Sequence, residues 1–245
     1  MIYTGFASMY DELMQDIPYE KWGIYITDVL RKALPAQEEI LVVDLACGTG
    51  TMTLLLAEQG FDMIGVDMSY DMLAAAQEKA YEKGKNILFL AQKVQELDLF
   101  GTVDAMVSVC DGFNYILEET ELVTAFERVR LFLNPGGVFI FDMNTEYKFK
   151  ELLGQKSFEG EAKGGGSYEW DNNYNEETGV NEYRVQFFHK NGEHFTEVHK
   201  QRAYNPQAVV KMLKDAGFEN ISMYHEYTNE LPKADSLRIT FVAKL

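Results

Sequence analysis

Residues 40–50, Ile-Leu-Val-Val-Asp-Leu-Ala-Cys-Gly-Thr-Gly, determine how the rest of the chain is organised. An apolar run interrupted only by Asp44 and followed by small residues is typical of a buried parallel strand that leads through a glycine loop into a helix from Thr51. Gly48 lets the backbone turn sharply, and Gly50 has no Cβ, so a ligand can lie against the main chain. The stretch therefore predicts a nucleotide-binding crossover.

The loop lacks two features of phosphate-binding loops. A dinucleotide fingerprint places its third glycine where this chain has Thr53, and the lysine of a P-loop is also missing. The next short strand, residues 64–67, ends in Asp67, 17 residues after Gly50. At the tip of a neighbouring strand, this carboxylate can accept hydrogen bonds from both hydroxyls of a ribose. We therefore expect a nucleoside ligand without a pyrophosphate.

The ordered motifs resemble a known enzyme family. Val-Val-Asp-Leu-Ala-Cys-Gly-Thr-Gly followed by Gly-Val-Asp-Met-Ser is similar to the first two motifs of class I S-adenosylmethionine-dependent methyltransferases. Leu-Asn-Pro-Gly-Gly-Val-Phe-Ile-Phe-Asp, at residues 133–142, is similar to their turn and fifth strand, and the similarity covers residues 36–145. The resemblance implies an α/β fold with a doubly wound, seven-stranded, mostly parallel Rossmann-like sheet. It also implies S-adenosyl-L-methionine as the cofactor.

Helical periodicity and breaker residues place the other elements. They predict helices around residues 6–14 and 22–34, separated at Pro18, and further helices over 51–59, after Ser69 as N-cap, over 118–133 and from Pro206. Short apolar runs predict strands over 63–66, 87–91, 103–109, 138–141, 218–227 and 237–244, of which the last two should form an antiparallel hairpin.

The resemblance also indicates which residues meet the cofactor. Met68 follows Asp67 and either flanks the adenine or fills the core. The third motif usually carries an acidic residue for the adenine amino group, but here it has Gln92 and Lys93, so we expect the Gln92 amide and the Val94 backbone in that role. The predicted cofactor-binding residues are Asp44, Ala46, Cys47, Gly48, Gly50, Asp67, Met68, Gln92, Val94, Cys110 and Tyr115.

The reaction centre is expected at the end of the strand over 103–109, in residues 110–115, because ligands bind outside the carboxyl ends of parallel strands. Asp111 is a candidate catalytic residue. The motifs of nucleic-acid amine methylation and of cytosine C5 methylation are absent, so Cys110 is interpreted as a small cleft residue rather than a nucleophile. Tyr10 belongs to Phe-Ala-x-x-Tyr-Asp at 6–11, which looks like the family's N-terminal element; it either covers the methionine end of the cofactor or packs as core.

Asp111, Asp142 and Asn144 resemble in kind the oxygen ligands of metal-dependent catechol-type O-methyltransferases. Polar groups are already needed beside a positively charged sulfonium, so we expect no metal here.

The pattern changes after residue 154, where aromatic residues begin to alternate with polar ones. This alternation, with a hairpin turn expected at Asn191-Gly192, predicts three or four antiparallel strands inserted between the fifth and sixth strands of the sheet. We therefore divide the chain into a methyltransferase core, residues 1–154 and 205–245, and an inserted substrate cover, residues 155–204. In small-molecule methyltransferases such an insertion often selects the substrate.

Two further catalytic candidates lie at the end of this insertion. His199 can accept a proton from an amine or hydroxyl, and Arg202 can hold a substrate carboxylate. Strand alternation puts His199 and Gln201 on one face and Arg202 and Tyr204 on the other, so both candidates line one pocket only if a bulge intervenes. The alternative for each is a solvated sheet surface.

Composition limits the function further. The formal net charge is −17, from 39 acidic and 22 basic residues, and this balance argues against a nucleic-acid substrate because such binding relies on Lys and Arg. No apolar run has the length of a membrane span, the N-terminus lacks a secretory pattern, and two cysteines form no disulfide framework. We expect a cytoplasmic monomer or homodimer.

The sequence thus predicts methyl transfer from S-adenosylmethionine to nitrogen or oxygen of a small molecule by in-line displacement. Two alternatives stay open: a methyltransferase of tRNA or another nucleic acid, and a non-catalytic sensor that binds the cofactor. A nicotinamide-dependent oxidoreductase would need the missing third glycine.

Overall fold

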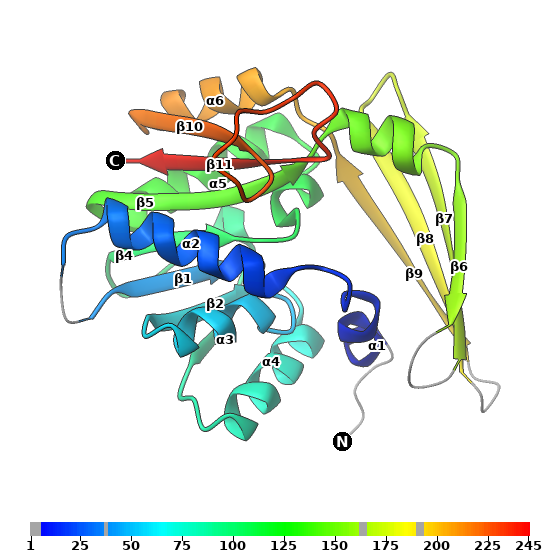
Figure 1. Ribbon diagram of the computed structural model, residues 1–245, viewed down its shortest axis with the longest axis horizontal. Helices are drawn as coiled ribbons and strands as arrows, with labels where there is room; N and C mark the ends of the chain where they lie inside the picture. The colour runs from blue at the N-terminus through cyan, green and yellow to red at the C-terminus, as the bar shows by residue number, and fades with distance from the viewer. Residues whose placement is uncertain (1–5, 37–38, 162–165, 190–193) are drawn as a thin grey trace.

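A mixed sheet of seven strands carries the core of the chain in the computed structural model, which describes residues 6–36, 39–161, 166–189 and 194–245 (Figure 1). Its order is β10-β11-β5-β4-β1-β2-β3. The strands are β1 (Leu41–Leu45), β2 (Asp62–Asp67), β3 (Leu88–Ala91), β4 (Val103–Ser108), β5 (Leu133–Asn144), β10 (Asn220–His225) and β11 (Arg238–Lys244). Neighbours from β5 to β3 are parallel, whereas β11 is antiparallel to both β5 and β10.

The strand order reverses between β1 and β4, which are hydrogen-bonded neighbours. The chain proceeds outward from β1 to β2 and β3, and then returns to β4 and β5 on the other side. A crevice opens at such a switch point, beyond the carboxyl ends of the strands. The predicted doubly wound fold is confirmed, and the reversal places the glycine loop after β1 beside the turn after β4.

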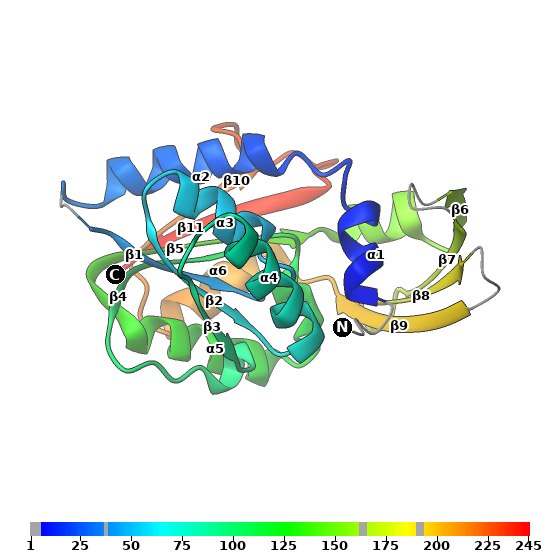
Figure 2. The same cartoon turned by 90° about the horizontal axis from the view of Figure 1, so that it is seen from below.

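Helices cover both faces of the sheet (Figure 2). α2 (Tyr19–Ala33), α3 (Thr51–Glu58) and α4 (Tyr70–Glu82) pack on one face, and α5 (Glu119–Phe132) and α6 (Pro206–Asp215) on the other. Successive residues of β1 alternate between these two layers: Val42 belongs to the apolar cluster that includes α2 and α3, and Val43 to the cluster that includes α5 and α6. None of the helices in the described ranges is both long and apolar enough to span a membrane.

A second sheet of four antiparallel strands lies between β5 and α6 in the sequence. Its order is β6 (Ser157–Glu161), β7 (Gly166–Asn175), β8 (Val180–His189) and β9 (His194–Arg202). A π-helical segment, η3 (Lys148–Leu153), leads into it from β5. In Figure 1 this sheet stands to one side of the core, beyond the carboxyl ends of the parallel strands. The predicted hairpin turn at Asn191-Gly192 lies outside the described residues.

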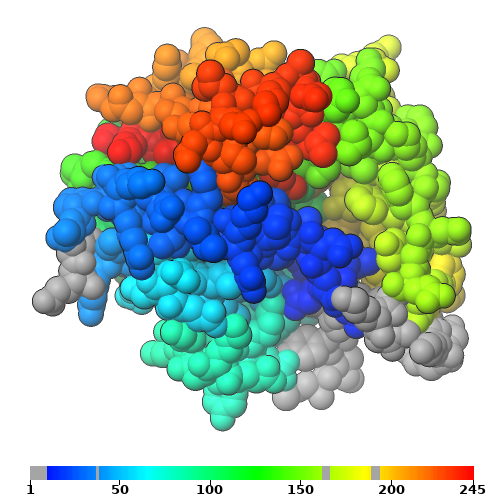
Figure 3. Space-filling model, viewed as in Figure 1, coloured from blue at the N-terminus to red at the C-terminus, as the bar shows by residue number. Residues whose placement is uncertain are grey.

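The N-terminal helix α1 (Phe6–Leu13) lies between the core and the inserted sheet (Figures 1 and 2). Leu13 packs with Val185 and Phe187 on the inner face of the inserted sheet. In the space-filling view the blue N-terminal segment bridges the two parts of the molecule (Figure 3). α1 thus covers the edge of the core sheet that carries the glycine loop.

The observed elements follow the predicted ones closely, with one clear difference at β5. The turn that we predicted at residues 134–137 is part of the strand, which begins directly after α5. Val103 pairs with Leu133 but Ala105 already pairs with Val138, so the Pro-Gly-Gly residues form an irregularity within the β4–β5 ladder. A Pro-Gly-Gly sequence is compatible with a bulge inside a strand as well as with a turn before one, so the sequence alone does not distinguish the two.

Candidate functional site

The glycine loop combines left-handed backbone with close packing. Ala46, Gly48 and Gly50 have φ values of 54°, 53° and 74°. A Cβ at Gly50 would lie 2.9 Å from the Cβ of Ala76 in α4, too close for any side chain. Gly50 is therefore needed to pack the loop against α4, and a left-handed residue there also favours glycine.

Asp67 is fixed at the tip of β2, beside the glycine loop. Its Oδ2 accepts a hydrogen bond of 2.9 Å from the backbone N–H of Gly48, and its Oδ1 accepts one of 2.8 Å from the backbone N–H of Ser69. Burial raises the pKa of this carboxyl. Each oxygen retains a lone pair for a further donor, so the geometry suits the predicted ribose contact, which stays a prediction.

Thr53 replaces the third glycine of the dinucleotide fingerprint and has a role of its own. Its hydroxyl donates a hydrogen bond of 2.6 Å to Oδ2 of Asp44, which is 1% exposed. Burial raises the pKa of Asp44 to about 7. The helix α3 is thereby tied to the end of β1, in place of the close helix–strand contact that a glycine would allow.

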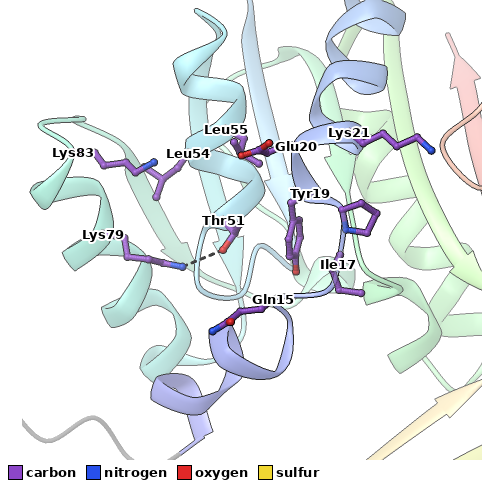
Figure 4. A pocket seen from close by; sticks show the side chains of 11 residues that line it. Gln15, Ile17, Tyr19, Glu20, Lys21, Thr51, Leu54, Leu55, Lys79 and Lys83 are labelled. Atoms are coloured by element: carbon purple, nitrogen blue, oxygen red, sulfur yellow. Dashed lines mark hydrogen bonds between the residues drawn. The ribbon is translucent and has the colours of Figure 1, made fainter. Parts of the chain in front are cut away.

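α1 closes over the loop through Asp11. The Thr49 hydroxyl donates to its Oδ1 at 2.6 Å, and Nζ of Lys79 lies 2.8 Å from its Oδ2. Lys79 also donates to the hydroxyl of Thr51 at 3.1 Å (Figure 4). Three segments, α1, the glycine loop and α4, thus meet at one carboxylate.

A small cavity over the glycine loop brings six of the predicted residues together. It is lined by Tyr10, Tyr19, Asp44, Ala46, Cys47, Gly48, Thr49, Thr51, Met52, Val109 and Cys110. Tyr10 enters it from α1, and burial raises the pKa of its hydroxyl well above the ordinary value. The cavity lies where the switch point predicts a ligand.

Other predicted cofactor residues lie outside this cavity. Met68 is 67% exposed. Gln92 lies next to Asp67, to whose carbonyl its backbone N–H donates at 3.0 Å, but its side-chain amide exchanges hydrogen bonds with the backbone of Asp98. Val94 begins the short helix η1 (Val94–Glu96). The adenine contacts assigned to these residues stay predictions.

A larger groove, of about 560 Å³, lies on the outer side of Tyr19 (Figure 4). Its walls come from the link between α1 and α2, from α3 and from α4. Tyr19 and Thr51 line both cavities, so they form part of the wall between the groove and the glycine loop.

The turn after β4 forms the opposite wall. Cys110 and Asp111 both have left-handed backbone, with φ values of 63° and 57°. The Cys110 thiol donates to the hydroxyl of Tyr19 at 3.3 Å, and burial raises its pKa to about 11. A thiol with a raised pKa is a poor nucleophile at neutral pH, which fits the interpretation of Cys110 as a cleft residue.

Asp111 belongs to a buried charge cluster whose cation, Arg238, was not predicted from the sequence. Nη2 of Arg238, in β11, donates to its Oδ1 at 2.6 Å, while Nη1 of Arg238 donates to Asp142 at the end of β5. Burial favours the neutral acid, but Arg238 and Lys148 outweigh it and lower the pKa of Asp111. The sequence grouped Asp111 with Asp142 but gave no sign of Arg238, because this residue lies on the last strand, far from both in the sequence. In the described part of the chain, no group of His, Cys, Asp and Glu side chains is arranged to hold a metal ion.

His199 lies on the inner face of β9 beside two tyrosines. Its ring stacks on that of Tyr183, with centroids 4.8 Å apart. The Tyr115 hydroxyl, on η2 (Gly112–Tyr115), hydrogen-bonds the Tyr183 hydroxyl and lies 3.5 Å from Nδ1 of His199. Burial lowers the pKa of His199, so the imidazole is neutral near pH 7.

Arg202 points to a different place. Its guanidinium donates to the Leu117 carbonyl at 2.8 Å and to Glu119 at 3.2 Å, and it lies over the ring of Tyr204. The structure thus brings Tyr10 and Cys110 together and His199 beside Tyr115, but directs Arg202 toward the start of α5. The substrate contact assigned to Arg202 stays a prediction.

Comparison with known proteins gives a consistent result. A family model described as a methyltransferase domain matches residues 42–137. The Bacillus subtilis protein YqeM, which is assigned to the methyltransferases, is 36% identical over 248 residues, covering 100% of this chain and 97% of YqeM. A crystal structure of an S-adenosylmethionine-dependent methyltransferase from Clostridium acetobutylicum is 31% identical, with a TM-score of 0.89 over 99% of this chain and 98% of that one. CalS10 from Micromonospora echinaspora, an amino pentose methyltransferase with the cofactor bound, shares the fold at 18% identity, with a TM-score of 0.75 over 100% of this chain and 98% of its own.

Proposed function

The chain belongs to the S-adenosylmethionine-dependent methyltransferases, and from this we propose that it methylates a nitrogen or oxygen of a small molecule held between the core and the inserted sheet. One observation carries the proposal. The inner face of β9 presents His199, with Tyr183, next to Tyr115 at the end of the β4 turn. An acceptor in this position lies between the cofactor side and a wall of aromatic groups.

The residues at the switch point offer polar groups that suit the cofactor. Asp67 is already oriented by two backbone N–H groups and can accept from ribose hydroxyls. Asp67 also gives this end of the sheet an acidic character that suits a sulfonium cation. When bound, the cofactor supplies an activated methyl group.

The residues of the chain then contribute alignment and exclusion of water. Tyr10 and α1 cover the glycine loop, and the inserted sheet covers the other side. Positioning of two reactants alone reaches effective molarities of about 10⁵ M or more, so a strong base is not required. The neutral imidazole of His199 is suited to accept the proton that an amine or hydroxyl loses.

Several features favour this acceptor class over a nucleic acid. The net charge of −17 opposes a phosphate backbone. The four-stranded inserted sheet stands beyond the carboxyl ends of the parallel strands (Figure 1), and as a cover over the acceptor it would leave little room for a polymer. CalS10, a fold neighbour, acts on an amino pentose, and a nitrogen acceptor in this chain would be consistent with that.

The proposal is tested by transfer of radiolabelled methyl from S-adenosylmethionine into a cell extract of the source organism. Label should appear in the small-molecule fraction, with or without nuclease, and should depend on His199. His199→Gln should lower the transfer, whereas His194→Gln, on the same strand but exposed, should not.

Two outcomes would overturn the proposal. Nuclease-sensitive label would identify a nucleic-acid substrate. Absence of label in any fraction, with cofactor binding confirmed by calorimetry and extracts from several growth conditions tried, would favour a cofactor sensor.

A further inference from the structure

We propose that Gln201 is a positioning residue: it sets Asp111 and thereby couples the inserted sheet to the wall of the cofactor cleft. Gln201 lies on β9, is 3% exposed and does not line the cavity over the glycine loop. Any effect of its side chain on cofactor binding must therefore pass through its neighbours. The inference rests on the proposed function only in treating the inserted sheet as the cover of the acceptor.

Asp111 receives contacts from three separate elements. Its Oδ1 accepts from Arg238 of β11 at 2.6 Å, and its Oδ2 accepts from Nε2 of Gln201 at 2.5 Å. Its backbone N–H donates to Asp142 of β5 at 3.1 Å. One carboxylate thus joins the last strand of the core to the last strand of the inserted sheet.

The core side of this link is buried, and its polar groups are hydrogen-bonded. Arg238 is 5% exposed and Asp142 is fully buried. The Tyr227 hydroxyl donates to the other oxygen of Asp142, and the ring of Trp22 stacks on Tyr227 at 4.5 Å and lies 5.2 Å from the Arg238 guanidinium. A charged network with every partner in place resists displacement. Asp111 is therefore anchored on one side by the core and adjusted on the other by Gln201.

The turn that Asp111 belongs to is strained and lies against the glycine loop. Non-glycine residues with left-handed backbone persist where surrounding contacts hold them, and both Cys110 and Asp111 have this conformation. A Cβ at Gly112 would lie 2.8 Å from the Cβ of Ala46. Gly112 thus packs closely against the loop, and we expect a shift of Asp111 to be passed to its chain neighbours Val109 and Cys110, which line the cavity.

Two other side chains also join the end of the inserted sheet to the core. The Asn114 amide donates to the carbonyl of Arg202 at 2.8 Å and to that of Asn144 at 3.2 Å. Tyr204 donates to the carbonyl of Ile116 at 2.6 Å. Removing the Gln201 amide should therefore loosen the carboxylate of Asp111 while the sheet remains attached.

Both oxygens of Asp111 are engaged by protein donors, and the carboxylate faces Arg238 and, at longer range, Lys148. A carboxylate in this setting is a poor proton acceptor. We therefore assign it to positioning, in place of the direct catalytic role that its sequence position suggested.

The test compares Gln201→Met, which keeps the size of the side chain without its donor, with Asn181→Leu. Asn181 is directly opposite Gln201 on β8, is fully buried, and bonds Asn172 rather than Asp111. All proteins carry Cys47→Ser, so that Cys110 is the single thiol. Two readouts are used: the Kd for S-adenosylhomocysteine by calorimetry, and the rate of Cys110 modification by a maleimide.

Gln201→Met should raise the Kd fivefold or more and accelerate Cys110 modification by a similar factor, and Gln201→Glu, which repels Asp111, should do so more strongly. Asn181→Leu should change both by less than twofold. The proposal is overturned if both folded Gln201 variants stay within twofold of the parent, or if Asn181→Leu has the same effect. No acceptor takes part, so the result is independent of the test for acceptor class.

Discussion

The hydroxyl of Thr49 in the glycine loop donates a hydrogen bond of 2.6 Å to the carboxylate of Asp11, 38 residues earlier in the chain. The same carboxylate is paired with Lys79 of α4. α1 is therefore fastened over the glycine loop. If the cofactor binds at this loop, as we propose, release of α1 is expected to limit its exchange.

Replacement of Asp11 should make that exchange faster. Asp11→Asn weakens the contact with Lys79, so we expect S-adenosylhomocysteine to dissociate several-fold faster, as measured by stopped-flow displacement. The pair is partly exposed, so the free energy of unfolding should change by less than about 1 kcal/mol. The exposed pair of Lys211 and Asp215 on α6 supplies the control, Asp215→Asn. An unchanged dissociation rate would show that α1 does not gate the site.

Asp67 should account for a large share of cofactor affinity. Asp67→Asn replaces a charged acceptor by an amide, and hydrogen bonds to charged groups contribute about 1.5–3 kcal/mol. The Kd for S-adenosylmethionine should therefore rise roughly 10- to 100-fold in calorimetry. Asp62→Asn, at the exposed start of the same strand, should bind like the parent; equal losses in both variants would contradict the role assigned to Asp67.

Asp44 should impose a pH dependence on stability. Its pKa is raised to about 7 in the folded protein from 3.8, so between these values the folded state holds a proton that the unfolded state has lost. Stability from this group is full below about pH 4 and falls as pH rises toward 7, by up to about 1.4 kcal/mol per pH unit. Urea unfolding at pH 4.5, 5.5, 6.5 and 7.5 should show this trend in the difference between the parent and Asp44→Asn. A difference that is constant with pH would refute it.

His199 should determine the acid limb of the pH–rate profile, in which the rate of methyl transfer falls at low pH. Burial lowers its pKa below 6.5, so the imidazole is neutral above that pH and the rate should be flat there. The rate should fall as pH drops through the folded pKa, because a protonated imidazole accepts no proton. His199→Gln should lower the rate by about 10²–10⁴-fold and remove the limb. Persistence of the same limb in the variant would assign it to another group.

The two thiols should react slowly, and their modification should impair cofactor binding. Cys47 and Cys110 line the same cavity at the ends of neighbouring strands, and burial raises the pKa of both. We expect slow alkylation at pH 7.5, protection by S-adenosylhomocysteine, and a higher Kd once both thiols are blocked, followed by mass spectrometry and calorimetry. Unchanged affinity after complete modification would exclude this arrangement of the cleft.

Local sequence patterns predicted most of the core and the position of Asp67 beside the glycine loop. Pro18 separates α1 from α2, and Ser69 caps α4 by accepting from the N–H of Met72. Asp67 was placed beside the glycine loop from strand order alone, and the structure has it bonded to Gly48. Such features depend on a few neighbouring residues or on the usual connection between parallel strands, so they can be predicted from a single sequence.

The acceptor side was less predictable because its contacts join distant segments. Trp22 from the first long helix lies against Arg238 from the last strand, and no periodicity relates the two. Arg202 looked available for a substrate, yet its partners Leu117 and Glu119 lie on a different element. The direction of a side chain on a strand can be predicted, but the partner that it meets depends on how the inserted sheet is docked.

The inserted sheet has an evolutionary consequence. β5 and β11 pair without interruption from Asn144 to Val138, although residues 157–202 leave and return between them. The entropic cost of closing a loop grows only with the logarithm of its length, about 0.6 kcal/mol for each doubling. Strands can therefore be added, lost or changed in the insertion while the pairing of β5 with β11 is kept. Lineages that share this core are therefore expected to acquire new substrates by remodelling the insertion, with the nucleoside end of the enzyme inherited intact.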